Sequence, residues 1–278
     1  MRIIIDKTTN FKISNKTIIF DNNRVPLNLI DMIIILSDSE LSTKDILTIT
    51  KNNITILLST QKGKDFAFIS GYKAKNSDFK EKQYNGLKHK EEITDWILTQ
   101  KFQNSKTTLN KLGLDIELPQ TDKNLRNIEG SFARKYFSLY FSLFKAPISK
   151  GKRTKQPPLD PLNAMMSYVY SIVYYEITKE LLKNGLEPTI SYLHIPFREH
   201  FALSSDLLEI FRADIDFFVA RLFLDKKLTA RSFTNNKGIY LRTETRREIW
   251  EEITLFINTL KIQISITNLK TKIKKLLS

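Results

Sequence analysis

The sequence predicts an α+β protein, in which a small N-terminal β-sandwich-like domain is followed by a larger all-α domain. Three observations favour this fold class. The chain has 278 residues, and domains of roughly 150 residues make two domains the expectation. Short β-branched and aromatic runs fill the first 72 residues, whereas apolar residues recur at helical spacing from residue 83. Residues 73–82 lose both patterns and predict a linker between domains at 1–72 and 83–278.

The first domain is predicted to contain short strands and one helix. Turn-forming Asn, Asp, Ser and Gly residues separate the strands. The helix begins at Ser42, where Asp45 completes a capping-box pattern three residues later. The strands are expected at Ile3–Ile5, Phe11–Ile13, Thr17–Phe20, Met32–Leu36, Ile54–Leu58 and Phe66–Ile69.

The second domain is predicted to be mostly helical. Thr121-Asp122 is expected to cap a long helix that reaches about Phe144 and is apolar nearly all round, so it should be buried. A helix from Asn163 to Lys183 follows a proline-rich segment, and Gly185 ends it. Helical spacing also recurs at about 93–114, 201–211, 215–224 and 246–260, and along the basic C-terminal tail.

The charge composition predicts an anionic partner. The chain has 44 Lys and Arg residues against 30 Asp and Glu residues, a net charge of +14. Nucleic acid is the commonest such partner, an anionic membrane is the next, and solubility alone is the third explanation. The absence of cysteine excludes disulfides, thiolate zinc sites and cysteine nucleophiles. Since no segment looks like a signal peptide or a membrane span, we expect a soluble, cytoplasmic protein.

A carboxylate in the long apolar helix is the first candidate for chemistry. Glu129 must find a cation, a metal or a proton if it is buried, because an unpaired buried charge is costly. A salt bridge with Arg126, Arg134 or a more distant basic group is the alternative to a metal. Gly130 is unfavourable in a helix interior and often marks the close approach of another backbone or a ligand.

A histidine and two carboxylates form a second candidate cluster. His194 lies in an irregular segment, and Asp206 and Glu209 lie three residues apart on one side of an amphipathic helix. One imidazole with several carboxylates suits Mn²⁺ or Mg²⁺ better than structural zinc. A purely structural explanation stays open: Glu209 can pair with Arg212, Asp206 can be solvated, and His194 can be a hydrogen-bonded core histidine.

Three ordered blocks of sequence carry a family resemblance. Residues 128–137 read IEGSFARKYF, and residues 157–170 read PPLDPLNAMMSYVY. The third block joins GLEP at 185–188 to LH at 193–194 and DLLEIFR at 206–212. In order and separation the blocks resemble the CRISPR-associated (Cas) protein one family, the endonuclease and integrase of spacer acquisition. The resemblance covers roughly residues 121–215, and its departures at Val169, His200 and Ile210 replace no ligand.

The resemblance implies a function and a site. Members are metal-dependent DNA endonucleases and integrases of CRISPR adaptation, an antiviral defence, and join the 3′-OH ends of short DNA fragments into the repeat array. Glu129, His194 and Glu209 are then catalytic residues that bind Mg²⁺ or Mn²⁺, with Asp206 as an accessory catalytic carboxylate in the helical catalytic domain.

The resemblance also implies an assembly. It predicts a homodimer formed largely through the β-rich domain, and a small dimeric partner protein that bridges two such dimers. Two other functions stay open: a transposase-like integrase of a mobile element, and a non-catalytic nucleic-acid-binding protein.

Basic runs flank the candidate site on both sides in the sequence. Each run can be a solvated helix face, but three runs around one metal site favour a phosphate track on double-stranded DNA. The residues expected to bind DNA are Lys150, Lys152, Arg153, Arg242, Arg246 and Arg247.

Overall fold

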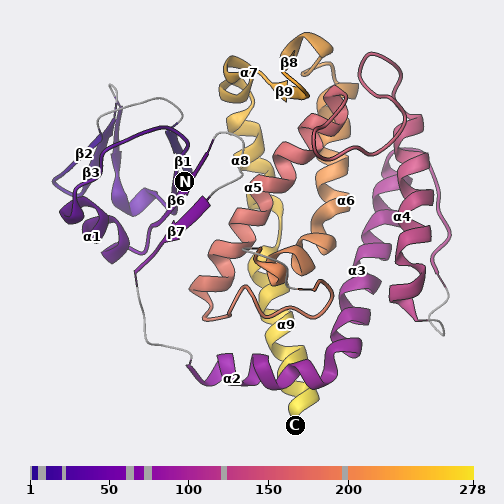
Figure 1. Ribbon diagram of the computed structural model, residues 1–278, viewed down its shortest axis with the longest axis horizontal. Coiled ribbons are helices and arrows are strands. Elements are labelled where there is room, and N and C mark those ends of the chain that lie inside the picture. Colours follow the sequence, from indigo (N-terminus) through magenta and orange to yellow (C-terminus); the bar gives the residue numbers. More distant parts are fainter. Residues whose placement is uncertain are drawn as a thin grey trace. The chain divides into compact units, whose positions relative to one another are not determined.

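The computed structural model describes residues 2–5, 11–20, 23–60, 66–71, 77–119, 124–195 and 200–278. The chain divides into two compact units, residues 1–75 and 76–278. Strands fill the first unit and helices most of the second (Figure 1), which confirms the predicted α+β fold class.

The first unit consists of two sheets that share one core. The larger sheet has the strand order β1-β5-β6-β7, in which β5 is parallel to β1 and β6, and β7 is antiparallel to β6. The smaller sheet is antiparallel, in the order β2-β3-β4. Ile18 of the smaller sheet and Ile33 and Ile56 of the larger one belong to the same buried cluster. The strands are β1 (Arg2–Ile5), β2 (Phe11–Ser14), β3 (Thr17–Phe20), β4 (Asn23–Pro26), β5 (Met32–Ile35), β6 (Thr55–Ser59) and β7 (Phe66–Ile69).

Local signals explain most of this unit. Strand β5 is buried along its whole length, as its unbroken apolar run predicts for a central parallel strand. Helix α1 (Thr43–Lys51) begins after Ser42, whose hydroxyl accepts a hydrogen bond from the Asp45 backbone N–H at 3.1 Å. Strand β4 was not predicted, because Asn and Pro are uncommon in strands and Val25 is its only apolar β-former.

Helix α2 (Ser77–Asn85) overturns part of the predicted linker at 73–82. The linker prediction is wrong from residue 77 onward, and residues 73–76 lie outside the described chain. Two buried side chains anchor α2 in place of an apolar stripe. Phe79 packs beneath the Lys270 ammonium, and the Gln83 side chain donates to the carbonyls of Glu187 and Ile190. These anchors leave no periodic pattern, so the segment reads as a linker in the sequence.

Long helices form the second unit. Helix α3 (Lys90–Lys111) packs against α6 (Ala202–Leu224) on one side and α4 (Leu125–Ser142) on another, and α5 (Pro161–Lys183) packs against α6 (Figure 1). A small hairpin contacts α5 at the end remote from α2. The remaining elements are β8 (Phe233–Asn235), β9 (Ile239–Leu241), α7 (Thr243–Glu248), α8 (Trp250–Thr259) and α9 (Ile262–Leu277).

Helix α4 differs from its prediction in two respects. Its N-cap is Asn124, whose side-chain oxygen accepts from the Arg126 backbone N–H at 3.1 Å, while Thr121-Asp122 lies outside the described residues. The helix is also buried on one side only: Phe132 and Tyr136 are buried, whereas Arg134 is exposed. Aromatic residues off the buried face made the sequence read as apolar all round.

The long helices α5 and α6 also differ from their predicted bounds: α5 begins earlier, and α6 continues further. Asp160 caps α5 by accepting from the Asn163 backbone N–H at 2.8 Å, so the helix begins at Pro161 rather than at Asn163. Helix α6 continues through residues 212–214, where a break was expected. Arg212, a polar residue in this stretch, pairs with Glu209 one turn earlier.

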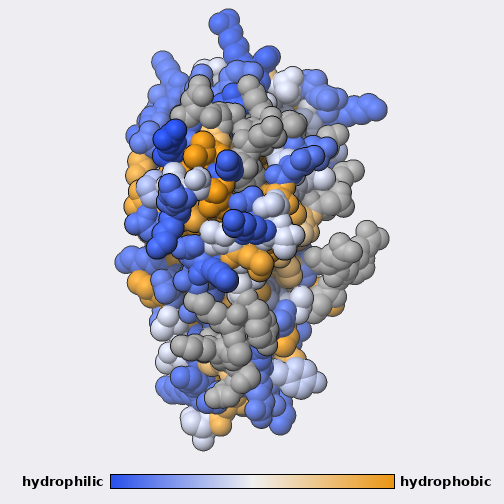
Figure 2. Space-filling model, turned by 90° about the vertical axis from the view of Figure 1, so that its left-hand side faces the viewer, coloured by the Kyte–Doolittle hydropathy of each residue, from blue (hydrophilic) through white to orange (hydrophobic). Residues whose placement is uncertain are grey.

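The surface in view is mainly hydrophilic. On the face shown in Figure 2, hydrophobic residues form small groups between hydrophilic ones. Within the described residues, no helix combines the length and the hydropathy that a membrane span requires.

Candidate functional site

A cavity of about 140 Å³ lies where α3, α4 and α6 meet, within the second unit. Two of the predicted metal ligands, Glu129 on α4 and Glu209 on α6, line it. Its wall is mixed, with apolar side chains from α4 beside several charged groups. The charged groups are Lys101, Glu129, Arg153, Lys155, Glu209, Arg212 and Asp216.

One ammonium group joins the two carboxylates. Lys101 on α3 donates a hydrogen bond to Glu129 Oε1, and its Nζ lies 2.6 Å from Glu209 Oε2. The second contact is an ion pair whose angle falls outside hydrogen-bond geometry. The structure therefore brings Glu129 and Glu209 together, although 80 residues separate them in the chain (209 − 129 = 80).

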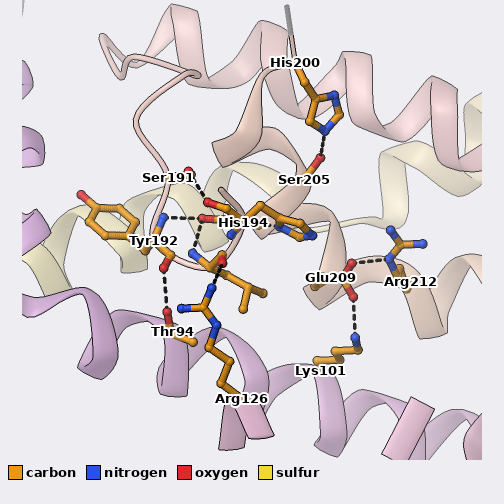
Figure 3. Close-up of polar contacts among 12 residues, drawn as sticks. Thr94, Lys101, Arg126, Ser191, Tyr192, His194, His200, Ser205, Glu209 and Arg212 are labelled. Atoms are coloured by element: carbon orange, nitrogen blue, oxygen red, sulfur yellow. Dashed lines mark hydrogen bonds and ion pairs between the residues drawn. The ribbon is translucent and has the colours of Figure 1, made fainter. Parts of the chain in front are cut away.

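Cations hold Glu209 in its charged form. Its other oxygen accepts from Arg212 Nε at 2.6 Å, as the spacing of three residues allows on a helix (Figure 3). Burial favours the neutral carboxyl group, but Arg212 and Lys101 outweigh burial and lower the pKa of Glu209 to about 2. Burial likewise disfavours the Lys101 ammonium, yet Glu209 and Glu129 raise the pKa of Lys101 above its ordinary value.

Asp206 fixes the segment that carries His194. Its carboxylate is fully buried and accepts from three backbone N–H groups, those of Tyr192, Leu193 and His194, at 2.6, 3.0 and 2.8 Å. It also lies 2.8 Å from His194 Nδ1. Asp206 is thus not solvated, and it determines where the imidazole lies.

Neighbouring helices fasten the same segment. Thr94 on α3 donates to the Tyr192 carbonyl at 2.9 Å, and Arg126 on α4 donates to the Leu193 carbonyl at 3.0 Å (Figure 3). The His194 side chain remains 37% exposed, and its ring points toward the Glu209 side chain in Figure 3. Because Asp206 occupies Nδ1, the free nitrogen of the ring is Nε2.

The donor chemistry fits a divalent cation, although the side chains do not yet surround one point. Among the described residues, no three His, Asp or Glu side chains are grouped as metal ligands. Two carboxylates nevertheless converge on one cationic group, and a carboxylate-bound imidazole beside them is the arrangement typical of metal-binding histidines. Two carboxylates and one imidazole suit Mg²⁺ or Mn²⁺. The donor types of Glu129, Glu209 and His194 are therefore those of a Mg²⁺ or Mn²⁺ site, and their binding of such an ion stays a prediction.

Behind the carboxylates lies a buried cluster that the sequence did not reveal. Asp216 on α6 is fully buried and accepts hydrogen bonds from the hydroxyls of Tyr136 and Tyr170. The guanidinium groups of Arg212 and Arg153 lie 4.8 and 5.5 Å from the Tyr170 ring centroid. Burial raises the pKa of Asp216 to about 7, against the lowering effect of these hydroxyls and guanidinium groups.

The loop between α4 and α5 divides the predicted DNA-binding residues into two groups. Lys150 and Lys152 are exposed. Arg153 instead points inward: it donates to Asn163 Oδ1 at 2.8 Å and to Ser167 Oγ at 3.2 Å, and it lines the cavity. The predicted contact of Arg153 with DNA stays a prediction, and its present side-chain partners lie on α5. Arg153 is partly exposed and lines the cavity.

Lys155 is a cation of the cavity that the predicted DNA-binding residues did not include. It has no ion-pair partner within the part of the chain that the structure describes. Desolvation of its ammonium, together with the neighbouring Arg212 and Arg153, lowers the pKa of Lys155. Lys155 thus lies near two further cations at the cavity wall.

The second basic group lies at the β8–β9 hairpin and α7. The Arg242 Nε donates to the carbonyls of Arg231 and Phe233 at 3.0 and 3.2 Å, so its aliphatic part and Nε brace the hairpin. Arg246 donates to Thr243 Oγ1 at 3.0 Å, and Arg247 is exposed. That these three arginines bind DNA phosphates stays a prediction.

Gly130 does not mark a close approach. A Cβ atom at this position would meet nothing within 4 Å, and the residue is exposed. The expectation that another backbone packs there is wrong for the described chain. A helix side open to solvent next to Glu129 is what the structure shows instead.

The sequence resembles known proteins over most of its length. Residues 3–254 match the family described as CRISPR associated protein Cas1. The CRISPR-associated endonuclease Cas1 1 of Thermodesulfovibrio yellowstonii is 30% identical over 253 residues, which cover 81% of this chain and 80% of that protein.

Solved structures share the fold. A Cas1 protein from Thermotoga maritima superposes with a TM-score of 0.83 at 19% identity, covering 98% of this chain and 97% of that one. A casposase bound to integration product gives a TM-score of 0.81 at 19% identity over 99% and 90% of the two chains. A Cas6-RT-Cas1–Cas2 complex gives 0.75 at 16% identity over 99% of this chain and 35% of that one. With the match of residues 3–254 and the relative from Thermodesulfovibrio, these findings show that the chain belongs to the Cas1 family.

Proposed function

We propose that this chain is a divalent-metal-dependent DNA endonuclease and integrase of CRISPR adaptation. The observation that carries the proposal is the convergence of Glu129 and Glu209 on one cationic group beside His194, whose Nδ1 is held by Asp206. The names of the relatives, a Cas1 endonuclease and a casposase bound to integration product, support the same reaction class.

Each residue would have a defined task in phosphodiester transfer. A Mg²⁺ or Mn²⁺ ion held there would supply a lowered pKa for an attacking water or 3′-hydroxyl, and positive charge beside the phosphorus oxygens. Glu129, Glu209 and His194 would hold that ion. Asp206 keeps the imidazole oriented, and Arg212 fixes one oxygen of Glu209, so that the rotamers are set before substrate arrives.

The cavity next to these ligands is suited to a phosphate group. Its volume, about 140 Å³, is roughly ten times the 10–15 Å³ that one water needs. Lys155 and Arg153 supply positive charge on its wall, and Lys155 lacks an acidic partner within the described residues. We infer that DNA approaches with a phosphate directed at this wall, while exposed Lys150 and Lys152 contact the flanking backbone.

The partners we propose are double-stranded DNA, a second copy of this chain and a small dimeric protein. The net charge of +14 supports binding to DNA. The structural relative that is a Cas6-RT-Cas1–Cas2 complex supports a Cas2-type partner. Dimerisation through the β-rich unit is a proposal taken from the family resemblance.

Substitution of the ligands tests the proposal. We expect His194→Ala and Glu129→Ala to reduce strand joining by at least about a hundredfold, because the metal stabilises charge that develops in the transition state. Duplex binding should change little, since phosphate contacts on the basic surface hold the ground state. Both side chains are partly exposed, at 37% and 33%, so the variants should fold.

A matched control separates this effect from the mere loss of a histidine. His89→Ala removes a side chain that pairs with Glu92 on the surface of α3, far along the helix from Lys101. It should leave joining unchanged. If the ligand variants join DNA at the wild-type rate with Mn²⁺, the assignment of the site is wrong.

A casposase-like integrase is the second candidate, favoured by the TM-score of 0.81 to a casposase. The choice of target distinguishes the two functions. Joining of fragments into a repeat array supports adaptation, whereas joining only of ends that carry inverted repeats supports the mobile-element function. A non-catalytic nucleic-acid binder is disfavoured, because the sequence retains Glu129, His194 and Glu209, whose side chains have the donor chemistry of metal ligands.

A further inference from the structure

Lys101 holds an unusual position among the groups of the candidate site. Its side chain extends from α3 and ends between Glu129 of α4 and Glu209 of α6. Only 12% of the side chain is exposed, so the ammonium is a largely buried charge rather than a surface one. One ammonium thus pairs with two carboxylates from two other helices, which repel each other.

The contacts of Lys101 are incompatible with full coordination of a divalent ion. Lys101 approaches Glu209 Oε2 to 2.6 Å, while Arg212 takes the other oxygen of the same carboxylate. Lys101 also takes Oε1 of Glu129. An ion that binds these oxygens would meet the ammonium within a few ångströms, where like charges repel strongly in a partly desolvated site.

The surroundings allow the ammonium to leave. Lys101 lines the cavity, so its long flexible side chain has free volume on one side. The other buried cation of the site, Arg212, has less freedom because it is bonded to Glu209 and lies over the Tyr170 ring. Of the two, Lys101 is the group that can exchange.

We propose that Lys101 is a built-in counter-ion of this site, which a divalent cation must displace in order to bind Glu129 and Glu209. The inference rests on the proposed metal-dependent function and adds a residue that opposes metal binding. In the metal-free protein Lys101 keeps the carboxylates of α4 and α6 together. The affinity of the site for a divalent cation is therefore lower than it would be without Lys101, because binding must break the two ion pairs that Lys101 makes.

Titration calorimetry with Mn²⁺ on EDTA-treated protein tests the exchange. Lys101→Met keeps the length of the side chain and removes its charge, so we expect it to bind Mn²⁺ about tenfold more tightly than wild type, or tighter still. Its metal-free form should melt at a lower temperature than wild type, and Mn²⁺ should raise that melting temperature by a larger interval. Lys106→Met, on the same helix with a 38% exposed side chain, is the matched control and should bind Mn²⁺ as wild type does.

A charge-conserving variant keeps the test decisive if Lys101→Met does not fold. Lys101→Arg retains the cation, so it should bind Mn²⁺ no more tightly than wild type, and tighter binding would overturn the exchange. For folded Lys101→Met, equal or weaker binding than wild type overturns it as well, and leaves the metal site intact. If neither wild type nor Lys101→Met binds Mn²⁺, the metal site of the proposed function is itself refuted, and the exchange with it.

Discussion

Buried charges with specific partners decide the chemistry of this site at the scale of single residues. Asp206 and Asp216 are both fully buried carboxylates of α6, yet their surroundings differ. Asp206 accepts from three backbone N–H groups and lies beside an imidazole. Asp216 is bonded to two tyrosine hydroxyls, and burial raises its pKa to about 7. One carboxylate therefore serves as a fixed anchor and the other is a group that can change charge near neutral pH.

The raised pKa of Asp216 gives a prediction for stability against pH. A folded-state pKa above the unfolded one means that the folded chain binds the proton more tightly. The contribution of Asp216 to the free energy of unfolding is therefore greatest below about pH 4 and falls as the pH rises to about 7. Relative to Asp216→Asn, wild type should lose at most about 4 kcal/mol over that interval, from a shift of roughly three units.

Urea unfolding of wild type and Asp216→Asn at several pH values between 4 and 8 measures the difference in their free energies of unfolding. The contributions of other titrating groups cancel in this difference. Asp225→Asn, a surface carboxylate paired with Arg221, is the control. A difference between wild type and Asp216→Asn that stays constant with pH, or grows, contradicts the prediction.

Some residues of the candidate site could be predicted from the sequence, and others could not. Glu129, His194, Asp206 and Glu209 lie in blocks whose order and spacing resemble a family, and the Glu209–Arg212 pair follows from helix geometry. Lys101 has no such signal. It is one of many lysines, and its partners lie 28 and 108 residues away (129 − 101 and 209 − 101), so only the packing of three helices brings them together.

At the scale of elements, the sequence predicts those that an apolar pattern or a cap defines. Strand β5 and helix α1 are of this kind. Strand β4 and helix α2 have neither signal. Backbone hydrogen bonds to β3 stabilise β4 at the edge of its sheet, and two buried side chains anchor α2. The predicted break in α6 fails for a related reason: polar residues interrupt the apolar pattern but have partners inside the unit.

The loop between α4 and α5 gives the prediction at this scale. Lys150 and Lys152 are exposed, while Arg153 ties the loop to Asn163 and Ser167 of α5. If the two lysines contact phosphates, each substitution to Ala should reduce the slope of log K against log salt by about 0.9 for duplex DNA of any sequence. Arg153→Ala should in addition lower the melting temperature, because it removes partly buried hydrogen bonds.

Binding titrations at several salt concentrations measure the slopes. Lys44→Ala, an exposed lysine of α1 in the other unit, serves as the control and should leave the slope unchanged. If the slope of log K against log salt is unchanged in Lys150→Ala and Lys152→Ala, the two lysines belong to a solvated surface that does not contact DNA.

At the scale of the whole molecule, the two units divide structure from chemistry. All groups that line the cavity, and the segment that carries His194, belong to residues 76–278. The first unit has a separate core, to which both of its sheets contribute. No described residue of the first unit lines the cavity.

Separate cores predict that the helical unit folds without the β-rich one. A fragment of residues 77–278 should therefore unfold cooperatively, with a helical circular dichroism spectrum. If the β-rich unit forms the dimer contact, this fragment should sediment as a monomer and the full chain as a dimer, because a stable interface buries at least about 1,200 Å² and cannot form from surface that has been removed. Analytical ultracentrifugation of both proteins over a range of concentrations decides the matter. A fragment that sediments as a dimer would place the dimer contact on the helical unit. In the proposed function DNA must reach the cavity, so that contact would have to lie elsewhere on the helices.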